Sequence, residues 1–258
     1  MEFGLTGKTA VITGASRGIG LEIARVLTAE GVRVAAGARR VTDELKEVTP
    51  HVLSVDLAEP AGPGEFIDFA LAELGGIDIL VNNLGFPHTR TGFLSVSDQD
   101  WLDGLTMNLL ATVRTTRAAL PSIVERRGSV VSLCSTNAHQ PLPMVVDYSA
   151  AKAGLLNLGK ALSEEFGPQG VRVNTVSCGP VMTDAWTGSG GIADVIAAQS
   201  GKTKEEIIDG APELLGSSTG THTTVDQVAS LVTFLVSRKA DNVNGAEFVI
   251  DGGFLKSI

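Results

Sequence analysis

The feature that most constrains the fold of this chain is a regular alternation of short apolar runs with longer segments of helical spacing. Apolar residues recur three and four positions apart in the longer segments, as at Ile23, Val26 and Leu27. Such alternation predicts an α/β fold with a parallel, doubly wound sheet and helices on both faces. The seven predicted strands are Lys8–Thr13, Val32–Gly37, His51–Val55, Ile77–Asn82, Ser129–Leu133, Val171–Val176 and Glu247–Ile250.

One domain can hold all seven strands. The chain has 258 residues, which exceeds the usual length of one domain, but α/β folds of this size often share a single core. Hydrophobic residues make up 43% of the sequence and charged residues 19%, which favours a well-buried sheet and leaves little for a disordered tail. We therefore expect residues 1–258 to form a single domain.

Local signals predict several helix starts and one segment outside the alternation. The predicted capping boxes are Ser97 with Asp100, Thr203 with Glu206, and Thr224 with Gln227. Residues 184–223 contain seven glycines around two short helical patterns. Long segments of this kind in compact domains are more often functional or disordered than idle, and this one is predicted to be a substrate lid. An ordinary surface insertion is the alternative.

Charge and cysteine content argue against several functions. The 20 basic and 29 acidic residues give a formal net charge of −9, which repels nucleic acid and anionic membrane surfaces. The N-terminus lacks a basic start followed by an apolar run, and no stretch approaches roughly eighteen uninterrupted apolar residues. We therefore expect a cytoplasmic protein without a membrane partner. Cys134 and Cys178 lack a paired-ligand spacing, so no metal site is expected.

A glycine-rich turn follows the first predicted strand directly and opens the first helix. Main-chain N–H groups and a helix N-terminus converge there, which suits an anion. Glycines let the backbone approach a pyrophosphate and let the helix pack close to the strand. A plain turn is the alternative, but a strand before and a helix after are what a dinucleotide site requires. The predicted cofactor-binding residues of this turn are Gly14, Ser16, Arg17, Gly18, Ile19 and Gly20.

The end of the second predicted strand indicates which dinucleotide is bound. An enzyme that selects the unphosphorylated ribose places an acidic side chain there, whereas this chain has Ala38. Arg39 and Arg40 follow at once, and Arg17 lies inside the glycine turn. Guanidinium groups can bind a ribose 2′-phosphate, so the pattern favours NADP(H) over NAD(H). The alternative is that these arginines are solvated surface charges.

Three motifs occur in a fixed order along the chain: Thr13-Gly14-Ala15-Ser16-Arg17-Gly18-Ile19-Gly20, Asn82-Asn83-Leu84-Gly85 and Tyr148-Ser149-Ala150-Ala151-Lys152. With these motifs the sequence resembles the short-chain dehydrogenase/reductase family, from about Leu5 to Gly253. Their order and intervals are far more specific than any single motif. The resemblance implies a Rossmann-type fold, a nicotinamide cofactor and a catalytic Ser-Tyr-Lys group with a supporting asparagine.

The resemblance also assigns roles to individual residues. It implies that Ser135 and Asn108 join Tyr148 and Lys152 in catalysis. Besides Arg39, which the end of the second predicted strand already indicates, the further predicted cofactor residues are Asp56, Leu57, Asn83, Gly85, Gly179, Val181 and Thr183, together with Tyr148 and Lys152. Two positions depart from the family pattern, because Leu84 replaces an alanine and Cys178 replaces a proline. Both departures put the shape of the nicotinamide pocket in doubt.

The spacing of Tyr148 and Lys152 supports proton transfer independently of the resemblance. Four residues apart on a helix, the two side chains share a face, and an ammonium near a phenol favours the phenolate. Tyr148 would then exchange a proton with the oxygen of the reacting carbon, to which Ser135 donates a hydrogen bond. Hydride passes to or from the nicotinamide. The alternative is a core tyrosine with a satisfied hydroxyl and a surface lysine.

The predicted function is therefore NADP(H)-dependent interconversion of a carbonyl and a secondary alcohol. Resemblance to 3-oxoacyl reductases makes a 3-oxo compound the leading substrate. A catalytically silent NADP(H)-binding sensor or scaffold is the main rival, which intact Ser135, Tyr148 and Lys152 argue against. A nucleotide-sugar epimerase would need a longer chain, and a nucleotide-phosphate enzyme would need a Gly-Lys-Ser/Thr turn.

Two expectations concern apolar residues. Those of the lid suggest an apolar substrate face, although they could instead pack the lid helices together: Met182, Trp186, Ile192, Val195 and Ile196. The resemblance further implies a homo-oligomer, a tetramer or a dimer, paired through the helices that flank the fifth strand. The C-terminal segment near Phe254 offers additional apolar surface.

Overall fold

Seven parallel strands form one sheet in the order β3-β2-β1-β4-β5-β6-β7. The computed structural model describes residues 3–256. The strands are β1 Thr9–Thr13, β2 Arg33–Ala38, β3 His51–Ser54, β4 Ile79–Asn82, β5 Ser129–Ser135, β6 Arg172–Cys178 and β7 Glu247–Ile250. Each overlaps one of the predicted strands, so the predicted α/β fold with a doubly wound sheet is confirmed.

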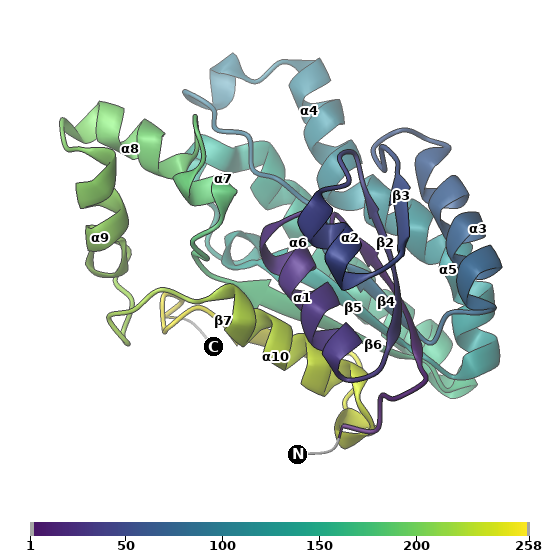
Figure 1. The fold of residues 1–258 in the computed structure, drawn as a ribbon. Helices are drawn as coiled ribbons and strands as arrows, with labels where there is room; N and C mark the ends of the chain where they lie inside the picture. The colour runs from purple at the N-terminus through teal and green to yellow at the C-terminus, as the bar shows by residue number, and fades with distance from the viewer. Residues whose placement is uncertain (1–2, 257–258) are drawn as a thin grey trace.

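Helices cover both faces of this sheet (Figure 1). The α-helices are α1 Gly18–Ala29, α2 Asp43–Val48, α3 Gly62–Leu74, α4 Asp98–Leu105, α5 Ala111–Arg126, α6 Val146–Phe166, α7 Asp184–Thr187, α8 Ile192–Ser200, α9 Lys204–Leu214 and α10 Val225–Val236. Two cores result. Leu27 of α1 and Leu235 of α10 pack on one face, and Phe66 of α3 and Ile123 of α5 pack on the other.

Strand order sets the position of the site. The sequence runs outward from β1 in one direction to β3, then returns to the other side of β1 at β4. At such a reversal the loops that leave the two neighbouring strands diverge, and a crevice opens at the carboxyl ends. The glycine turn after β1 and the Asn83–Gly85 segment after β4 both lie at this reversal.

Two strands extend further toward this edge than their apolar runs predicted. β5 ends at Ser135 and β6 at Cys178, each two residues later than expected. The ladder between them continues to the end and pairs Ser135 with Cys178. The predicted catalytic serine is therefore held by the sheet itself, because polar Ser135 and Cys134 fit the ladder as well as the apolar residues before them.

The predicted capping boxes are confirmed at the starts of α4, α9 and α10. Residues 184–223 hold three short helices, of which only α8 and α9 were foreseen (Figure 1). These helices have a small core of their own, formed by Trp186, Ile192 and Ala211 with Met182, Ile196 and Leu215 around them. Of the two readings of the apolar residues there, the structure supports packing of the lid helices on one another.

Within residues 3–256 no helix is long and apolar enough to cross a membrane. The same residues contain no cluster of three or more His, Cys, Asp or Glu side chains that could hold a metal ion.

Candidate active site

The glycine turn is shaped by contacts that leave no room for larger residues. A Cβ at Gly20 would lie 2.4 Å from Asn83 Nδ2 and 2.7 Å from the carbonyl oxygen of Gly14. Gly14 has φ of +67°, a backbone conformation that L side chains rarely adopt. The backbone of α1 therefore starts directly against the end of β1.

Asn83 braces this turn from the neighbouring strand. Its Nδ2 donates to the carbonyl oxygens of Thr13 and Gly14, both at 2.9 Å. The Thr13 hydroxyl accepts from the backbone N–H groups of Asn83 and Leu84, both at 3.0 Å. Asn83 was predicted to bind the cofactor, and in the structure its amide holds the turn in shape. Thr13 was missed as a site residue, although it is the first residue of the glycine motif.

The N-terminus of α1 is suited to an anion. Among the described residues no side chain caps this end of the helix, and its first turn has no acidic residue. The first N–H groups of a helix lack intrahelical partners and carry a partial positive charge. With the close approach at Gly20, the residues present fit a dinucleotide pyrophosphate at this point.

Three arginines were predicted near the ribose, and in the structure two of them follow β2 while the third precedes α1. Arg39 and Arg40 are exposed just beyond the end of β2. Arg17 precedes α1, and its guanidinium forms an ion pair with Asp184, the first residue of α7. Both side chains of that pair are more than half exposed, so it is weak by itself. Arg17 thus connects the glycine turn to the start of the segment 184–223, which was predicted to be a lid.

Asn108 lies where the helix after α4 widens. It belongs to a π-helical segment, Thr106–Leu110, a distortion frequently found at functional sites. Its Oδ1 accepts from the Phe86 N–H at 2.8 Å, and its Nδ2 donates to the carbonyl oxygens of Phe86 at 3.2 Å and Gly104 at 3.0 Å. Asn108 is buried, and both Oδ1 and Nδ2 of its amide have hydrogen-bond partners. It fixes the loop that follows β4.

Three predicted catalytic residues, Asn108, Lys152 and Tyr148, come together near Gly85. A Cβ at Gly85 would lie 3.0 Å from both Asn108 Oδ1 and Lys152 Nζ. Lys152 Nζ donates to the carbonyl oxygen of Leu133 at 2.8 Å and lies 5.5 Å from the centre of the Tyr148 ring. Lys152 is only 3% exposed, so the alternative of a surface lysine is excluded.

Ser135 completes the group from the end of β5. It is buried, and its hydroxyl accepts from the backbone N–H of Asn137 at 3.1 Å and from Asn137 Nδ2 at 3.3 Å. Both partners donate to the Ser135 oxygen, which leaves the Ser135 proton for another acceptor. A carbonyl oxygen beside Tyr148 would be such an acceptor.

Desolvation acts against the phenolate that the spacing of Tyr148 and Lys152 predicts. Burial raises the pKa of Tyr148 above its ordinary value of 10, and a hydrogen bond with Ser135 only partly offsets this. Burial likewise lowers the pKa of Lys152. Lys152 is buried and Tyr148 is half-buried, and desolvation penalises the charged form of each side chain, so the phenol stays protonated when no cofactor is bound. The sequence spacing showed their proximity but not this desolvation.

The chain contains a single tyrosine, so tyrosinate absorbance reports on Tyr148 alone. In the protein without cofactor we expect no tyrosinate signal below pH 10, because the pKa is raised above that value and the phenol stays protonated. Oxidised cofactor should move the transition to lower pH, since its cationic ring stabilises a phenolate. An ultraviolet pH titration with and without NADP⁺ measures both. A transition centred below pH 10 in the cofactor-free protein would contradict a raised pKa of Tyr148.

Cys178, the departure from the family's proline, is a core residue. It is 7% exposed, packs with Val176 and Val181, and burial raises the pKa of its thiol to about 12. Burial also raises the pKa of Cys134, whose Sγ donates to the carbonyl oxygen of Lys152 at 3.2 Å. Both thiols are therefore protonated and serve packing beneath the site.

The sequence and the fold are similar to those of known proteins. A family model described as Enoyl-(Acyl carrier protein) reductase matches residues 14–255. The chain therefore belongs to this family of short-chain dehydrogenase/reductase oxidoreductases.

Individual relatives differ in the substrates that they are named for. D-threitol dehydrogenase of Mycolicibacterium smegmatis is 34% identical, with 98% of this chain and 95% of that protein aligned. The 3-oxoacyl-[acyl-carrier-protein] reductase of Escherichia coli is 31% identical, with 96% and 97% aligned. The crystal structure of L-sorbose reductase from Gluconobacter frateurii, complexed with NADPH and L-sorbose, superposes with a TM-score of 0.90 at 30% identity over the full length of both chains.

Proposed function

We propose that this protein uses NADP(H) to interconvert a ketone and a secondary alcohol. The observation that carries the proposal is the convergence of Asn108, Lys152 and Tyr148 around Gly85, next to a glycine turn already shaped for a pyrophosphate. The cofactor complexes of the sorbose reductase and of a Burkholderia cenocepacia dehydrogenase support the choice of NADP(H).

The cofactor would lie along the carboxyl edge of the sheet and supply or accept the hydride. The turn from Gly14 to Gly20 would hold its pyrophosphate, and Arg39 its 2′-phosphate. The other residues proposed to line the cofactor are Asp56, Leu57, Asn83, Gly85, Gly179, Val181, Thr183, Tyr148 and Lys152. Gly85 gives the nicotinamide end close access to Lys152 because no side chain fills that space.

Tyr148 is the proposed acid in the reducing direction. Its raised pKa keeps the phenol protonated at neutral pH, so it can donate a proton to the oxygen of the substrate carbonyl. Ser135 would hydrogen-bond the same oxygen and stabilise the charge that develops on it. In the oxidising direction the phenolate is needed, and Lys152 would stabilise it once a bound cofactor adds a second positive charge.

Replacing Arg39 with Ala should weaken NADPH use selectively. Loss of a charge-assisted hydrogen bond costs about 1.5–3 kcal/mol, so the KM for NADPH should rise by about 10- to 100-fold. The KM for NADH should stay almost unchanged, because NADH lacks the phosphate. Steady-state kinetics with both cofactors measure this, with Arg25→Ala on α1 as a control that removes an exposed cation elsewhere. Equal use of NADH by the wild type would refute the NADP(H) preference.

Two substrate classes follow from different observations. A 3-oxo compound is supported by the 3-oxoacyl reductase and by the D-beta-hydroxybutyrate dehydrogenase of Rhizobium meliloti, which is 31% identical. A small polyhydroxylated ketone is supported by the threitol dehydrogenase and the sorbose reductase. The packing of Trp186 and Ile192 within the lid favours the polyhydroxylated ketone, because these residues are occupied with each other.

A carbonyl panel tests the proposal. NADPH consumption would be followed with L-sorbose, a four-carbon ketose, acetoacetate and an acetoacetyl thioester as substrates. Preference for a ketose would support the second class, and preference for acetoacetate or the thioester the first. NADPH binding without turnover of any ketone would instead indicate the silent sensor or scaffold and reject the enzymatic proposal.

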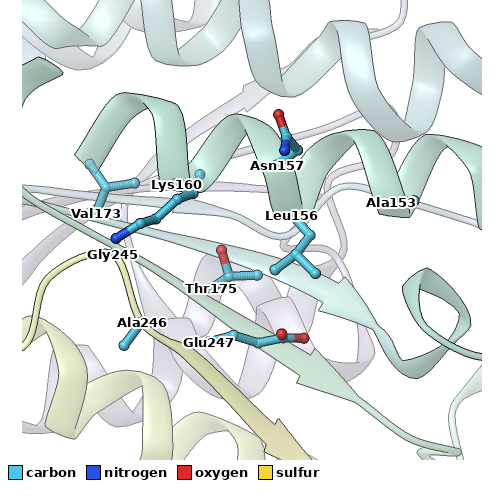
Figure 2. A pocket seen from close by; sticks show the side chains of 10 residues that line it. Ala153, Leu156, Asn157, Lys160, Val173, Thr175, Gly245, Ala246 and Glu247 are labelled. Atoms are coloured by element: carbon cyan, nitrogen blue, oxygen red, sulfur yellow. The ribbon is translucent and has the colours of Figure 1, made fainter. Parts of the chain in front are cut away.

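We also propose that two hollows on α6 are covered in a homo-oligomer. One hollow, of about 580 Å³, lies between α5 and α6 and is lined by Leu120, Leu158, Leu162 and Phe166. The other, of about 350 Å³, lies between α6, β6 and the turn before β7 (Figure 2). Two separate hollows would correspond to two interfaces, as a tetramer requires.

Sedimentation velocity at micromolar concentration should therefore give a tetramer. Leu162→Glu would place a charge in the larger hollow and should reduce the assembly to dimers, since burial of an unpaired charge is costly. A monomeric wild type would reject the proposed assembly.

A further inference from the structure

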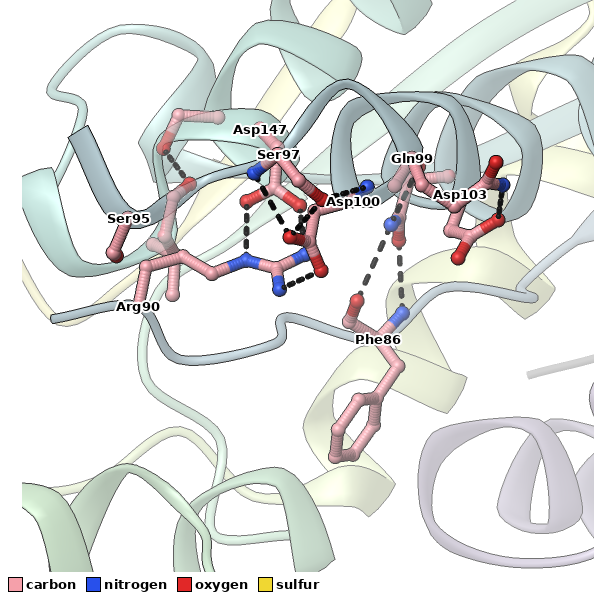
Figure 3. Close-up of polar contacts among 12 residues, drawn as sticks. Phe86, Arg90, Ser95, Ser97, Gln99, Asp100, Asp103 and Asp147 are labelled. Atoms are coloured by element: carbon pink, nitrogen blue, oxygen red, sulfur yellow. Dashed lines mark hydrogen bonds and ion pairs between the residues drawn. The ribbon is translucent and has the colours of Figure 1, made fainter. Parts of the chain in front are cut away.

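Arg90 joins three segments around the candidate site. It follows β4, in the loop that carries Gly85 and Phe86, and its guanidinium lies between two carboxylates, those of Asp100 and Asp147 (Figure 3). Nη1 donates to Asp100 Oδ1 at 2.7 Å, and Nη2 donates to Asp147 Oδ2 at 2.7 Å. Nε makes a longer contact with Asp147 Oδ1, at 3.4 Å.

The two carboxylates belong to the first turns of different helices. Asp100 lies in α4, where its other oxygen accepts from the N–H and hydroxyl of Ser97 in the capping box. Asp147 lies in the first turn of α6, immediately before Tyr148. The Arg90 N–H also donates to the carbonyl oxygen of Met144 at 2.7 Å, just before α6. One residue thus connects the β4 loop with the starts of both helices.

Burial makes the loss of the Arg90–Asp147 contact more costly than the loss of a surface ion pair. The Asp147 side chain is 2% exposed and the Arg90 side chain 15%. A carboxylate so far from water requires a cation and hydrogen bonds, and removing the cation is strongly unfavourable. The position of Asp147, and with it the first turn of α6, therefore depends on Arg90.

Asp147 is also packed against the segment that holds Asn108. A Cβ at Gly104 would lie 2.6 Å from Asp147 Oδ2, so α4 approaches this carboxylate as closely as a glycine permits. The carbonyl oxygen of Gly104 accepts from Asn108 Nδ2. Asp147 therefore precedes Tyr148 in the sequence and also contacts Gly104, whose carbonyl oxygen holds Asn108.

We propose that Arg90 is a positioning residue, which clamps Asp147 and so fixes Tyr148 relative to Asn108 and the loop after β4. The inference rests on the proposed carbonyl reduction, in which Tyr148 must meet the substrate oxygen at hydrogen-bond distance. A small displacement of an acid-base group costs turnover much more than it costs cofactor binding. The glycine turn that would bind the pyrophosphate lies between β1 and α1 and makes none of the hydrogen bonds of Arg90 described above.

Arg90→Met and Arg90→Lys test this role in the full-length protein. Arg90→Met keeps an unbranched side chain without charge and should lower kcat by about 10- to 100-fold, with the KM for NADPH almost unchanged. Lysine can reach one carboxylate but cannot bridge both, so Arg90→Lys should recover part of the lost kcat. Should Arg90→Met fail to fold, Asp147→Asn keeps the shape of the side chain and should lower kcat in the same direction.

Asp78→Asn is the matched control. Asp78 is another buried carboxylate, with its side chain 8% exposed. It is paired with Lys8 at the amino ends of the strands, away from the candidate site. This variant should lower thermal stability without changing kcat at a temperature where it is folded. The inference is overturned by wild-type kcat in folded Arg90→Met and Asp147→Asn, or by an equal loss in Asp78→Asn. An inactive wild type would instead refute the proposed function.

Discussion

Replacing Tyr148 with Phe is expected to abolish most turnover while leaving NADPH binding nearly intact. The change removes one hydroxyl and keeps the ring, whose centre lies 5.5 Å from Lys152 Nζ. A positioned acid-base contributes about 10² to 10⁴ in rate, so kcat should fall by at least that range. Steady-state kinetics on a ketone that the wild type reduces, with NADPH binding followed by fluorescence, measure the two effects separately.

Lys152→Ala provides a comparison of a different kind. Lys152 is buried with its ammonium on the carbonyl oxygen of Leu133, beside the open space at Gly85. Its removal should lower kcat and also weaken NADPH binding, if its ammonium reaches the nicotinamide ribose as the family resemblance implies. Near-normal turnover in Tyr148→Phe would contradict the proposed acid-base role even if the Lys152 variant were inactive.

Replacing Gly20 with Ala should damage the cofactor site through the backbone. The added Cβ would lie 2.7 Å from the carbonyl oxygen of Gly14 and 2.4 Å from Asn83 Nδ2, so the turn or its brace must shift. Such overpacking costs about 1–3 kcal/mol. If the turn must shift away from the shape that binds the pyrophosphate, the same free energy is lost from NADPH binding, which should weaken by about 10- to 100-fold. Binding measured by fluorescence or calorimetry gives the result.

Gly64→Ala is the control for this variant. Gly64 lies in α3, and nothing in the described part of the chain is within 4 Å of the Cβ that it would gain. Alanine there should leave NADPH affinity unchanged and stabilise the protein by up to about 1 kcal/mol. Unchanged affinity in Gly20→Ala would show that the turn does not bind the pyrophosphate.

The positions of the strands along the sequence could be predicted because each strand depends on its own local residues. β1 is buried along its whole length. A parallel strand that is covered on both faces has a nearly continuous run of apolar residues in its sequence. The glycine turn was recognisable for a similar reason, since both the strand before it and the helix after it are adjacent in sequence. Family motifs then identified Tyr148, Lys152 and Asn108, which the structure brings together around Gly85.

What the sequence did not reveal depends on contacts between distant segments. Arg17 pairs with a residue 167 positions away, so its connection with the lid had no local signal. Arg90 and Asp147 are separated by 57 positions, and an arginine in a loop resembles any solvated cation until its partner is known. The four-residue helix α7 is too short to show a period. The raised pKa of Tyr148 likewise depends on the packing of α6 against β5, which has no local signal in the sequence.

The most direct test of the account is the fate of a labelled hydrogen. The protein would be given NADPH with deuterium on the transferred position, together with the ketone that it reduces fastest, and the alcohol would be examined by mass spectrometry and NMR. We predict one deuterium on the carbinol carbon for each NADPH oxidised, and loss of this transfer in Tyr148→Phe. NADPH oxidation without deuterium in the alcohol, or equal transfer by Tyr148→Phe, would contradict Tyr148-dependent carbonyl reduction at this site.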